Sequence, residues 1–183
     1  MYRLFVCVEI PEPQKQALAR LSGDVPGARW LEPDEMHLTV RFIGEVDGVV
    51  FRDVMDALGE VRLAPFELTL RGVGHFPPRG EPRVLWAGLE RSPELKALHD
   101  KVESALVRVG LEPERRKFSP HVTIARLKNT PERAVGSFMA MHGLFRAEPF
   151  RVEEFHLYSS RLSAKRAVHR SEAVYPLDDT GAA

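Results

Sequence analysis

The sequence predicts an α+β fold in which a β-rich unit occurs twice along the chain. Strand-like apolar runs are interleaved with segments of helical periodicity. A His-x-Thr motif in a strand-like setting occurs at residues 37–39 and recurs at residues 121–123. No repeat of shorter period is visible, which argues against a solenoid.

Length and composition are those of an ordinary globular protein. The chain has 183 residues, of which 44% are hydrophobic and 28% charged, so it can bury a substantial core. Its formal net charge is zero, so an anion site must be built locally. The one cysteine, Cys7, excludes an internal disulfide framework and, lying in an apolar run, is expected in the core.

The N-terminal apolar run, residues 4–8, is too short for a signal peptide and lacks a small-residue cleavage site. No stretch of the sequence approaches the length of a membrane span. We therefore expect a cytoplasmic protein that has no membrane partner.

The expected elements follow from periodicity, capping residues and the positions of Gly and Pro. Strands are expected at residues 3–10, 37–43, 66–70, 83–89, 121–126, 150–162 and 167–177. Helices are expected at residues 13–22, 48–62, 92–109 and 131–141. The Gly- and Pro-rich residues 72–82 are expected to form a hairpin turn or rim loop, and residues 111–120 a basic connector.

Each motif strand presents a polar pair on one face. Successive side chains of an extended strand point to opposite faces. His37 and Thr39 therefore share one face, while Leu38 and Val40 lie on the other. If the two motif strands lie close together, two imidazoles and two hydroxyls meet in one cleft.

This set of groups suits phosphate chemistry. Imidazole gains or loses a proton near neutral pH, so two of them can act as general acid and general base. The hydroxyls and a nearby arginine can donate hydrogen bonds to an anionic phosphate. A metal site lacks a third ligand at convincing spacing, and a serine nucleophile lacks its Gly-x-Ser-x-Gly turn. Water or a substrate hydroxyl would then attack phosphorus.

Several blocks of sequence, in order, resemble a known family. They are residues 3–11, the first motif, residues 118–126 and residues 157–162. Together they resemble the RNA 2′,3′-cyclic phosphodiesterases of the two-histidine phosphoesterase superfamily, historically called 2′-5′ RNA ligases. The resemblance implies a bilobal α+β fold, with two pseudo-symmetric lobes of antiparallel sheet, outer helices and a central cleft. It implies one bilobal catalytic domain over residues 1–177 and a frayed tail at residues 178–183.

The same resemblance implies the activity and the role of each site residue. The reaction is metal-independent hydrolysis of an RNA 2′,3′-cyclic phosphate end to a 2′-phosphomonoester, with 2′-5′ ligation as its reverse. His37 would be the proton donor and His121 the proton acceptor, while Thr39, Thr123 and Arg126 would bind the phosphate. A strict strand would turn Arg126 away from His121, so we expect a turn or β-bulge between them. We expect no cofactor, a monomer, and RNA partners such as tRNA fragments.

Other residues leave alternatives open. Two basic groups could hold the RNA backbone or simply be solvated: Arg115, Arg116, Lys117 and Lys128, and Arg161, Lys165, Arg166 and Arg170. Phe76 and Tyr158 could stack on a base, although core packing is the simpler interpretation. The remaining histidines lack a threonine two positions on and are interpreted as surface or structural residues: His75, His99, His142, His156 and His169.

Two further functions remain possible. The first is a two-histidine phosphodiesterase that acts on another cyclic phosphate or on a 2′-5′ oligonucleotide. The second is a non-catalytic module that binds RNA ends.

Overall fold

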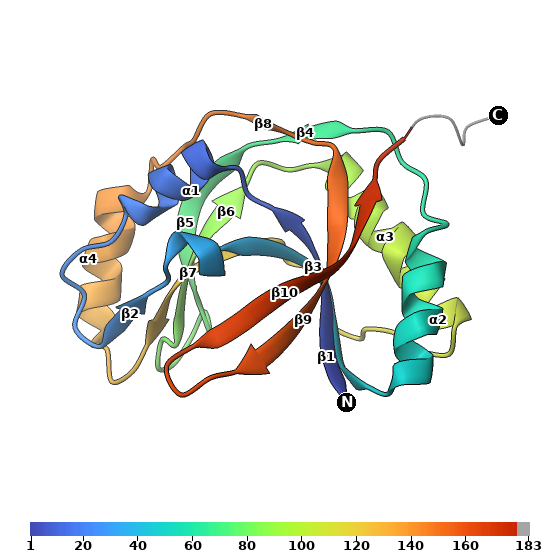
Figure 1. Cartoon of the computed structure of the whole chain (residues 1–183). Coiled ribbons are helices and arrows are strands. Elements are labelled where there is room, and N and C mark those ends of the chain that lie inside the picture. Colours follow the sequence, from blue (N-terminus) through green and yellow to red (C-terminus); the bar gives the residue numbers. More distant parts are fainter. Residues whose placement is uncertain (179–183) are drawn as a thin grey trace.

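The computed structural model describes residues 1–178 and contains two four-stranded antiparallel sheets. The first sheet has the strand order β10-β9-β1-β3 and the second β2-β7-β6-β5 (Figure 1). The strands of the first sheet are β1 (Tyr2–Glu9), β3 (His37–Val46), β9 (Glu154–Leu162) and β10 (Ala167–Pro176). Those of the second are β2 (Ala28–Trp30), β5 (Leu70–Phe76), β6 (Val84–Leu89) and β7 (Val122–Leu127). A short pair, β4 (Phe66–Leu68) and β8 (Phe150–Val152), completes the strands.

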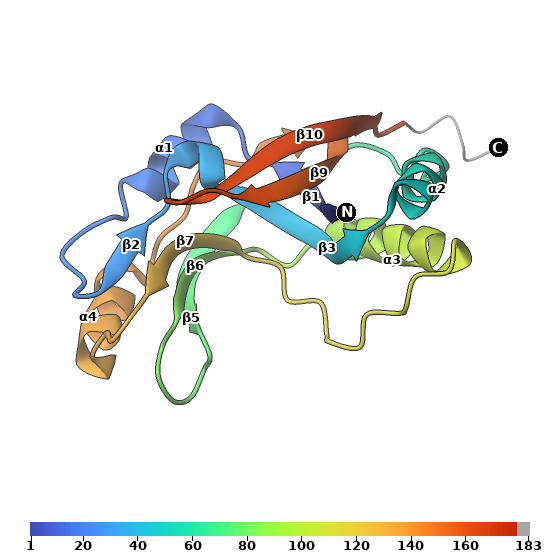
Figure 2. The same cartoon turned by 60° about the horizontal axis from the view of Figure 1, so that its bottom comes forward.

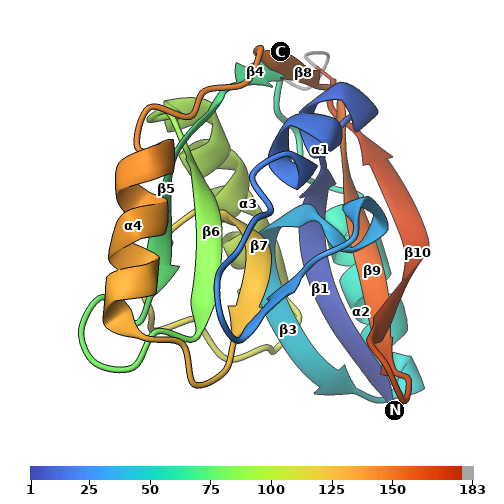
Figure 3. The ribbon, with the colours of Figure 1, turned by 90° about the vertical axis from the view of Figure 1, so that its left-hand side faces the viewer.

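Helices flank the two sheets, as Figures 2 and 3 show. The helices are α1 (Glu12–Ala19), α2 (Gly48–Leu58), α3 (Pro93–Arg108) and α4 (Glu132–His142), with a short 3₁₀ helix η1 (Pro33–Glu35). Helix α3 contacts both α2 and strand β3 of the first sheet, whereas α4 packs against β5 of the second. The expected bilobal α+β fold is therefore confirmed.

Local sequence signals set the helix boundaries. The carboxylate of Asp47 accepts hydrogen bonds from the backbone amides of Val49 and Val50, which caps the N-terminus of α2. The hydroxyl of Ser92 caps α3 in the same way through the amide of Leu95. No described helix is long and apolar enough to cross a membrane.

The hydrophobic core explains the uninterrupted apolar run near the N-terminus. Leu4 to Val8 are all buried because β1 is a central strand, with β3 on one side and β9 on the other. Cys7 lies in this run and is buried, as expected. Burial raises the pKa of its thiol.

The structure differs from the sequence-based expectation at several places. The expected strand at 150–162 is divided between β8, which pairs with β4, and β9, which pairs with β1 and β10. The three-residue strand β2 was not expected, because so short a strand carries no periodicity. The expected strand at 66–70 is divided between β4 and β5, which pair with different strands. The expected hairpin at residues 72–82 is confirmed, because β5 pairs antiparallel with β6, but its turn begins only after Phe76, where β5 ends.

Two glycines of this stretch, Gly72 and Gly74, have structural roles within β5. The register of β5 against β6 shifts between Leu70 and Val73, and Gly72 adopts a φ of +73° within that irregularity. Gly74 lies against the Trp86 indole, where a Cβ would overlap the ring. Of the expected tail at 178–183, residues 179–183 lie outside the described part of the chain.

Candidate active site

One cavity of about 440 Å³ is lined by residues from both sheets. All five residues singled out from the sequence line it: His37, Thr39, His121, Thr123 and Arg126. The first two lie on β3, at one edge of the first sheet, and the other three lie on or just before β7. The two motifs, far apart in the sequence, therefore meet at one site.

A β-bulge in β7 brings Arg126 to the cavity. Thr123 pairs with Trp86, but Ala125 pairs with Leu85, so Ile124 is an extra residue in the ladder. Ile124 and Ala125 are consequently buried one after the other, and Arg126 returns to the face that carries Thr123. The expected bulge is confirmed.

The first motif contains the same irregularity at the same position. Thr39 pairs with Cys7 and Arg41 with Val6, so Val40 is the extra residue of β3. Val40 and Arg41 are both buried, and Phe42 returns to the cavity. Phe42 in the first lobe therefore corresponds to Arg126 in the second.

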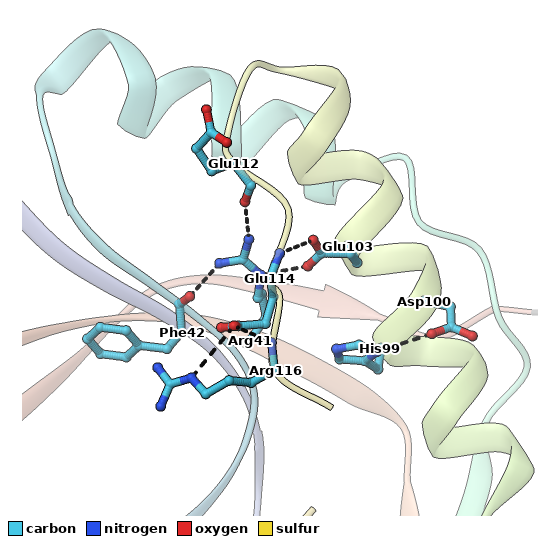
Figure 4. Close-up of polar contacts among 8 residues, drawn as sticks. All are labelled: Arg41, Phe42, His99, Asp100, Glu103, Glu112, Glu114 and Arg116. Carbon is cyan, nitrogen blue, oxygen red and sulfur yellow. Dashed lines mark hydrogen bonds and ion pairs between the residues drawn. The ribbon is translucent and has the colours of Figure 1, made fainter. Parts of the chain in front are cut away.

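Arg41 does not contribute to the cavity, although it follows the first motif closely. Arg41 is buried. Its guanidinium lies beside α3 (Figure 4), where Nε is 2.6 Å from Oε2 of Glu103. The guanidinium also donates to the carbonyl oxygens of Phe42 and Glu112, at 2.6 Å and 2.7 Å. Burial opposes ionisation of Glu103, but hydrogen bonds from Arg41 and from the Glu114 amide outweigh it and lower the pKa of that carboxyl.

The ring of His121 is oriented by the backbone just before it. Nδ1 lies 2.7 Å from the carbonyl oxygen of Ser119. Because a carbonyl only accepts, Nδ1 carries the proton and the neutral ring has its lone pair on Nε2. The ring of Phe76 meets the imidazole edge to face at a centroid distance of 4.9 Å.

The ring of His37 lies deeper. It stacks on Phe5 at a centroid distance of 4.8 Å and is hydrogen-bonded to the carbonyl of Glu35, also two residues before the histidine. Burial, followed by the positive charge of His169, lowers the pKa of His37 to about 4. In the unliganded protein at pH 7, His37 is therefore neutral.

The sequence-based interpretation of His169 as a surface or structural residue was wrong. His169, on β10, lines the cavity. It meets His37 edge to face at a centroid distance of 5.0 Å. Its Nδ1 is buried without a hydrogen-bond partner. A motif search could not find it, but the alternation along β10 could, because it places every second side chain on the cavity face.

The cavity also contains arginines that the sequence did not single out. Arg29 pairs with Arg126 across β2 and β7, and its Nη1 lies 3.3 Å from Oε1 of the buried Glu35. Arg3 enters from β1. None of the basic residues considered from the sequence, other than Arg126, lines this cavity. Among these, Arg116 pairs with Glu114 and Arg166 with Asp34.

Among the described residues, a group of side chains that could hold a metal ion lies outside the cavity. It consists of Glu9, Glu154 and His156, whose ligand atoms lie within 4.8 Å of one another. His156 is buried and within ion-pair distance of both carboxylates.

Two antiparallel lobes that each contribute a His-x-Thr strand to a shared cavity define a two-histidine phosphoesterase. Comparison with known proteins identifies the family. The model of the 2′-5′ RNA ligase superfamily matches residues 10–163, and the chain belongs to that superfamily.

Similar proteins cover nearly the whole chain. A protein named RNA 2′,3′-cyclic phosphodiesterase from Archaeoglobus fulgidus is 33% identical over 178 residues, 94% of this chain and 99% of that protein. A Thermus thermophilus protein of the same name is 35% identical, over 91% of this chain and 86% of its own. The solved structure of E. coli LigT with 3′-AMP is 25% identical, with a TM-score of 0.78 over 97% of this chain and 99% of LigT.

Proposed function

We propose that this protein hydrolyses 2′,3′-cyclic phosphate ends of RNA to 2′-phosphomonoesters. The observation that carries the proposal is the convergence of His37, His121, Thr39, Thr123 and Arg126 on one cavity. Similar proteins named RNA 2′,3′-cyclic phosphodiesterase, which cover nearly the whole chain, support the substrate class.

In the proposed reaction, a water oxygen attacks phosphorus while the bond from phosphorus to the ribose O3′ breaks. Nε2 of His121 takes the proton of the attacking water, because the Ser119 carbonyl holds the other ring nitrogen in its protonated form. Protonated His37 donates its proton to O3′. His121 has then gained one proton and His37 has lost one. Proton exchange of both rings with solvent returns the two histidines to their starting protonation states.

The negative charge of the phosphate is stabilised by Arg126 of the second lobe and by the two motif threonines. The hydroxyls of Thr39 and Thr123 donate to non-bridging oxygens, and the guanidinium of Arg126 supplies positive charge where negative charge develops. These groups lie on two bulged strands of different sheets, so the fold fixes them before substrate binds.

The protonation of His37 is coupled to binding. Burial and neighbouring positive charge keep the free ring neutral. A bound phosphate anion adds negative charge beside the ring and favours its protonated form. Calorimetric titration with inorganic phosphate, in buffers of different ionisation enthalpy, is expected to show proton uptake, and His37→Asn to remove it.

The reaction needs no cofactor in this scheme, because the imidazoles transfer the protons and arginine supplies the charge. Hydrolysis is therefore expected to persist in chelator. With a 5′-hydroxyl in place of water as the nucleophile, the same groups can open the cyclic phosphate at O3′ and leave a 2′-5′ linkage, which is ligation, but water is far more abundant than a competing hydroxyl.

The protein is further proposed to act as a monomer on RNAs such as tRNA fragments in the cytoplasm. Residues 1–177 would form one bilobal catalytic domain. The support is that one chain supplies every wall of the cavity, from β1 near its start to β10 near its end. Sedimentation at working concentration tests the oligomeric state.

The decisive experiment incubates the protein with an RNA that bears a 2′,3′-cyclic end and identifies the product. A 2′-phosphate is expected, with activity lost in both His37→Ala and His121→Ala while their circular dichroism spectra stay native. Activity that survives in both variants would remove the proposed mechanism.

The remaining alternatives are outcomes of the same assay. Turnover of 2′-5′ oligoadenylate or of another cyclic phosphate, with no turnover of the RNA end, would indicate a different substrate. Binding of the RNA end without turnover between pH 5 and 8, the range in which histidine titrates, would indicate a binding module.

A further inference from the structure

Three ionisable side chains meet at the end of β1, outside the active-site cavity. Glu9 is the last residue of β1, and Glu154 and His156 lie at the start of β9. The two strands are antiparallel neighbours (Figure 3), with Cys7 opposite His156. The same register, continued by two residues, puts Glu9 opposite Glu154. Two carboxylates directly opposite each other destabilise a sheet, and a positive charge between them removes the repulsion.

The imidazole of His156 is buried beside the two carboxylates. Its side chain is only 5% exposed, and among the described residues its Nε2 has no hydrogen-bond partner. Oε1 of Glu154 lies 3.3 Å from this nitrogen and Oε2 of Glu9 lies 3.6 Å from it, yet neither oxygen forms a hydrogen bond with it. A buried polar atom without a partner is unfavourable, and a cation bound between the three groups would supply the missing partner.

The distances between these atoms are those of ligands around one metal ion. The ligand atoms of the three residues all lie within 4.8 Å of one another. In a tetrahedral zinc site, bonds of about 2.0–2.1 Å place neighbouring ligand atoms about 3.4 Å apart. Both distances from Nε2 of His156, 3.3 Å and 3.6 Å, agree with that separation.

Further contacts orient two of the three side chains. Nδ1 of His156 lies 3.4 Å from Oγ of Ser171, which can accept its proton and leave the lone pair on Nε2. The hydroxyl of Tyr158 donates to Oε1 of Glu9, so that Oε2 faces His156. Metal-binding histidines and carboxylates have outer hydrogen bonds of this kind, which fix the tautomer and the orientation of each ligand.

The surroundings leave room for an ion and for water. All three residues line a cavity of about 270 Å³, and both carboxylate residues are exposed to solvent. Arg151 also lines this cavity, but its Nε lies 3.3 Å from Oε1 of Glu153 and its charge is paired there. Water can therefore reach a fourth ligand position from the carboxylate side.

We propose that Glu9, Glu154 and His156 bind a zinc ion, with water as its fourth ligand. An imidazole nitrogen with two carboxylates suits Zn²⁺, whereas Mg²⁺ and Ca²⁺ prefer oxygen ligands alone. None of the three residues lines the active-site cavity, so this inference is independent of the proposed hydrolysis. The ion joins the end of β1 to the start of β9 and stabilises the folded protein, because the unfolded chain does not hold the three ligands together.

The test titrates chelator-treated protein with zinc chloride by calorimetry. Binding of zinc is expected, and the Tm should rise by about 5–10 °C when free zinc is about a hundred times its Kd. Magnesium or calcium chloride at the same concentration should leave the Tm unchanged. Absence of zinc binding to the wild-type protein would overturn the proposal and leave only ion pairing between His156 and the two carboxylates.

A matched pair of variants locates the ion. Glu154→Gln replaces an exposed carboxylate by an amide of the same shape, and should weaken zinc binding at least about ten-fold while the circular dichroism spectrum stays native. Glu153→Gln is the control, because Glu153 is exposed and lines the same cavity but does not belong to the group. It should bind zinc as the wild type does. Equal weakening by both variants would show a response to net charge alone and would overturn the site.

The histidines of the active-site cavity are a competing location for zinc. Titration of His37→Asn tests this location, because that variant lacks one of the cavity imidazoles. His37→Asn is expected to retain a zinc site of wild-type affinity, and the double variant with Glu154→Gln should lose it. Loss of all zinc binding in His37→Asn alone would place the ion in the active-site cavity and refute the proposal.

Discussion

The ring of His37 meets the ring of His169 edge to face, with centroids 5.0 Å apart and planes at 86°. Phe5 packs against both rings, at 4.8 Å from His37 and 5.1 Å from His169. Two imidazoles this close, against an apolar ring, resist carrying positive charge at the same time. The protonation of the proposed acid is therefore linked to a third histidine.

Replacement of His169 by phenylalanine should raise the pKa of His37. Burial is the main cause of the low pKa, and the charge of His169 is the second. His169→Phe keeps the site apolar and removes only the charge, so the pKa rises from about 4. NMR titration of the His37 ring measures this rise directly.

The pH–rate profile should change accordingly. A proton donor is active below its pKa, so the alkaline limb of kcat in His169→Phe should lie at higher pH than in the wild type. His99→Phe is the control, because His99 stacks on Phe118 away from the cavity. An unchanged limb in His169→Phe would show that the two imidazoles are not coupled.

The stability of the protein should fall as the solution is acidified through the titration range of His37. The folded ring has a pKa of about 4 against 6.5 for a free one, so the unfolded chain binds more protons between these values. The free energy of unfolding is then highest above pH 6.5 and decreases towards pH 4. His37→Asn should flatten this decrease in urea denaturation series, whereas parallel curves would contradict the low pKa.

The buried ion pair of Arg41 should be far more important to stability than a surface pair nearby. Arg41→Met removes the guanidinium from two carbonyl oxygens and from the Glu103 carboxylate, which keeps only the Glu114 amide as a donor. This loss should cost about 3–5 kcal/mol. Arg116, 90% exposed beside Glu114, is the control, and Arg116→Met should cost under about 1 kcal/mol. Urea denaturation distinguishes the two, and equal losses would refute the structural role assigned to Arg41.

Two glycine-to-alanine substitutions should have opposite effects. A Cβ at Gly74 would overlap the Trp86 indole, whose centroid lies 6.2 Å from that of His121. Gly74→Ala should therefore cost about 1–3 kcal/mol and lower kcat by displacing the indole. Gly136 lies within α4 with nothing within 4 Å of a Cβ, so Gly136→Ala should stabilise by about 0.5–1 kcal/mol. Thermal unfolding and activity assays would detect both effects, and destabilisation by both substitutions would be evidence against this explanation.

The sequence indicated the motif strands because their polar and apolar residues alternate, which is a local property. The bulge before Arg126 was expected only because the family resemblance assigns Arg126 to the phosphate, whereas a regular strand would have turned that residue away. The same bulge after Thr39 was not anticipated, and its consequence, an inward Arg41 and a cavity-facing Phe42, depends on the pairing of β3 with β1.

The other cavity residues could not be assigned from the sequence because distant strands determine their surroundings. His169 lies beside His37 only because β9 and β10 join the sheet that contains β1 and β3. Arg29 lies beside Arg126 only because the three residues of β2 pair with β7. The periodicity of a single segment does not reveal which distant strand will pair with it.

The strand order of the first sheet also constrains how the protein reaches its active form. Strand β1 precedes the other strands along the chain, yet its neighbours in the sheet are β3 and the much later strand β9. During translation the antiparallel pair of β1 and β3 can form before β9 and β10 are made, but the cavity wall that carries His169 is then still missing. The cavity therefore has its complete lining only after β10 has been synthesised.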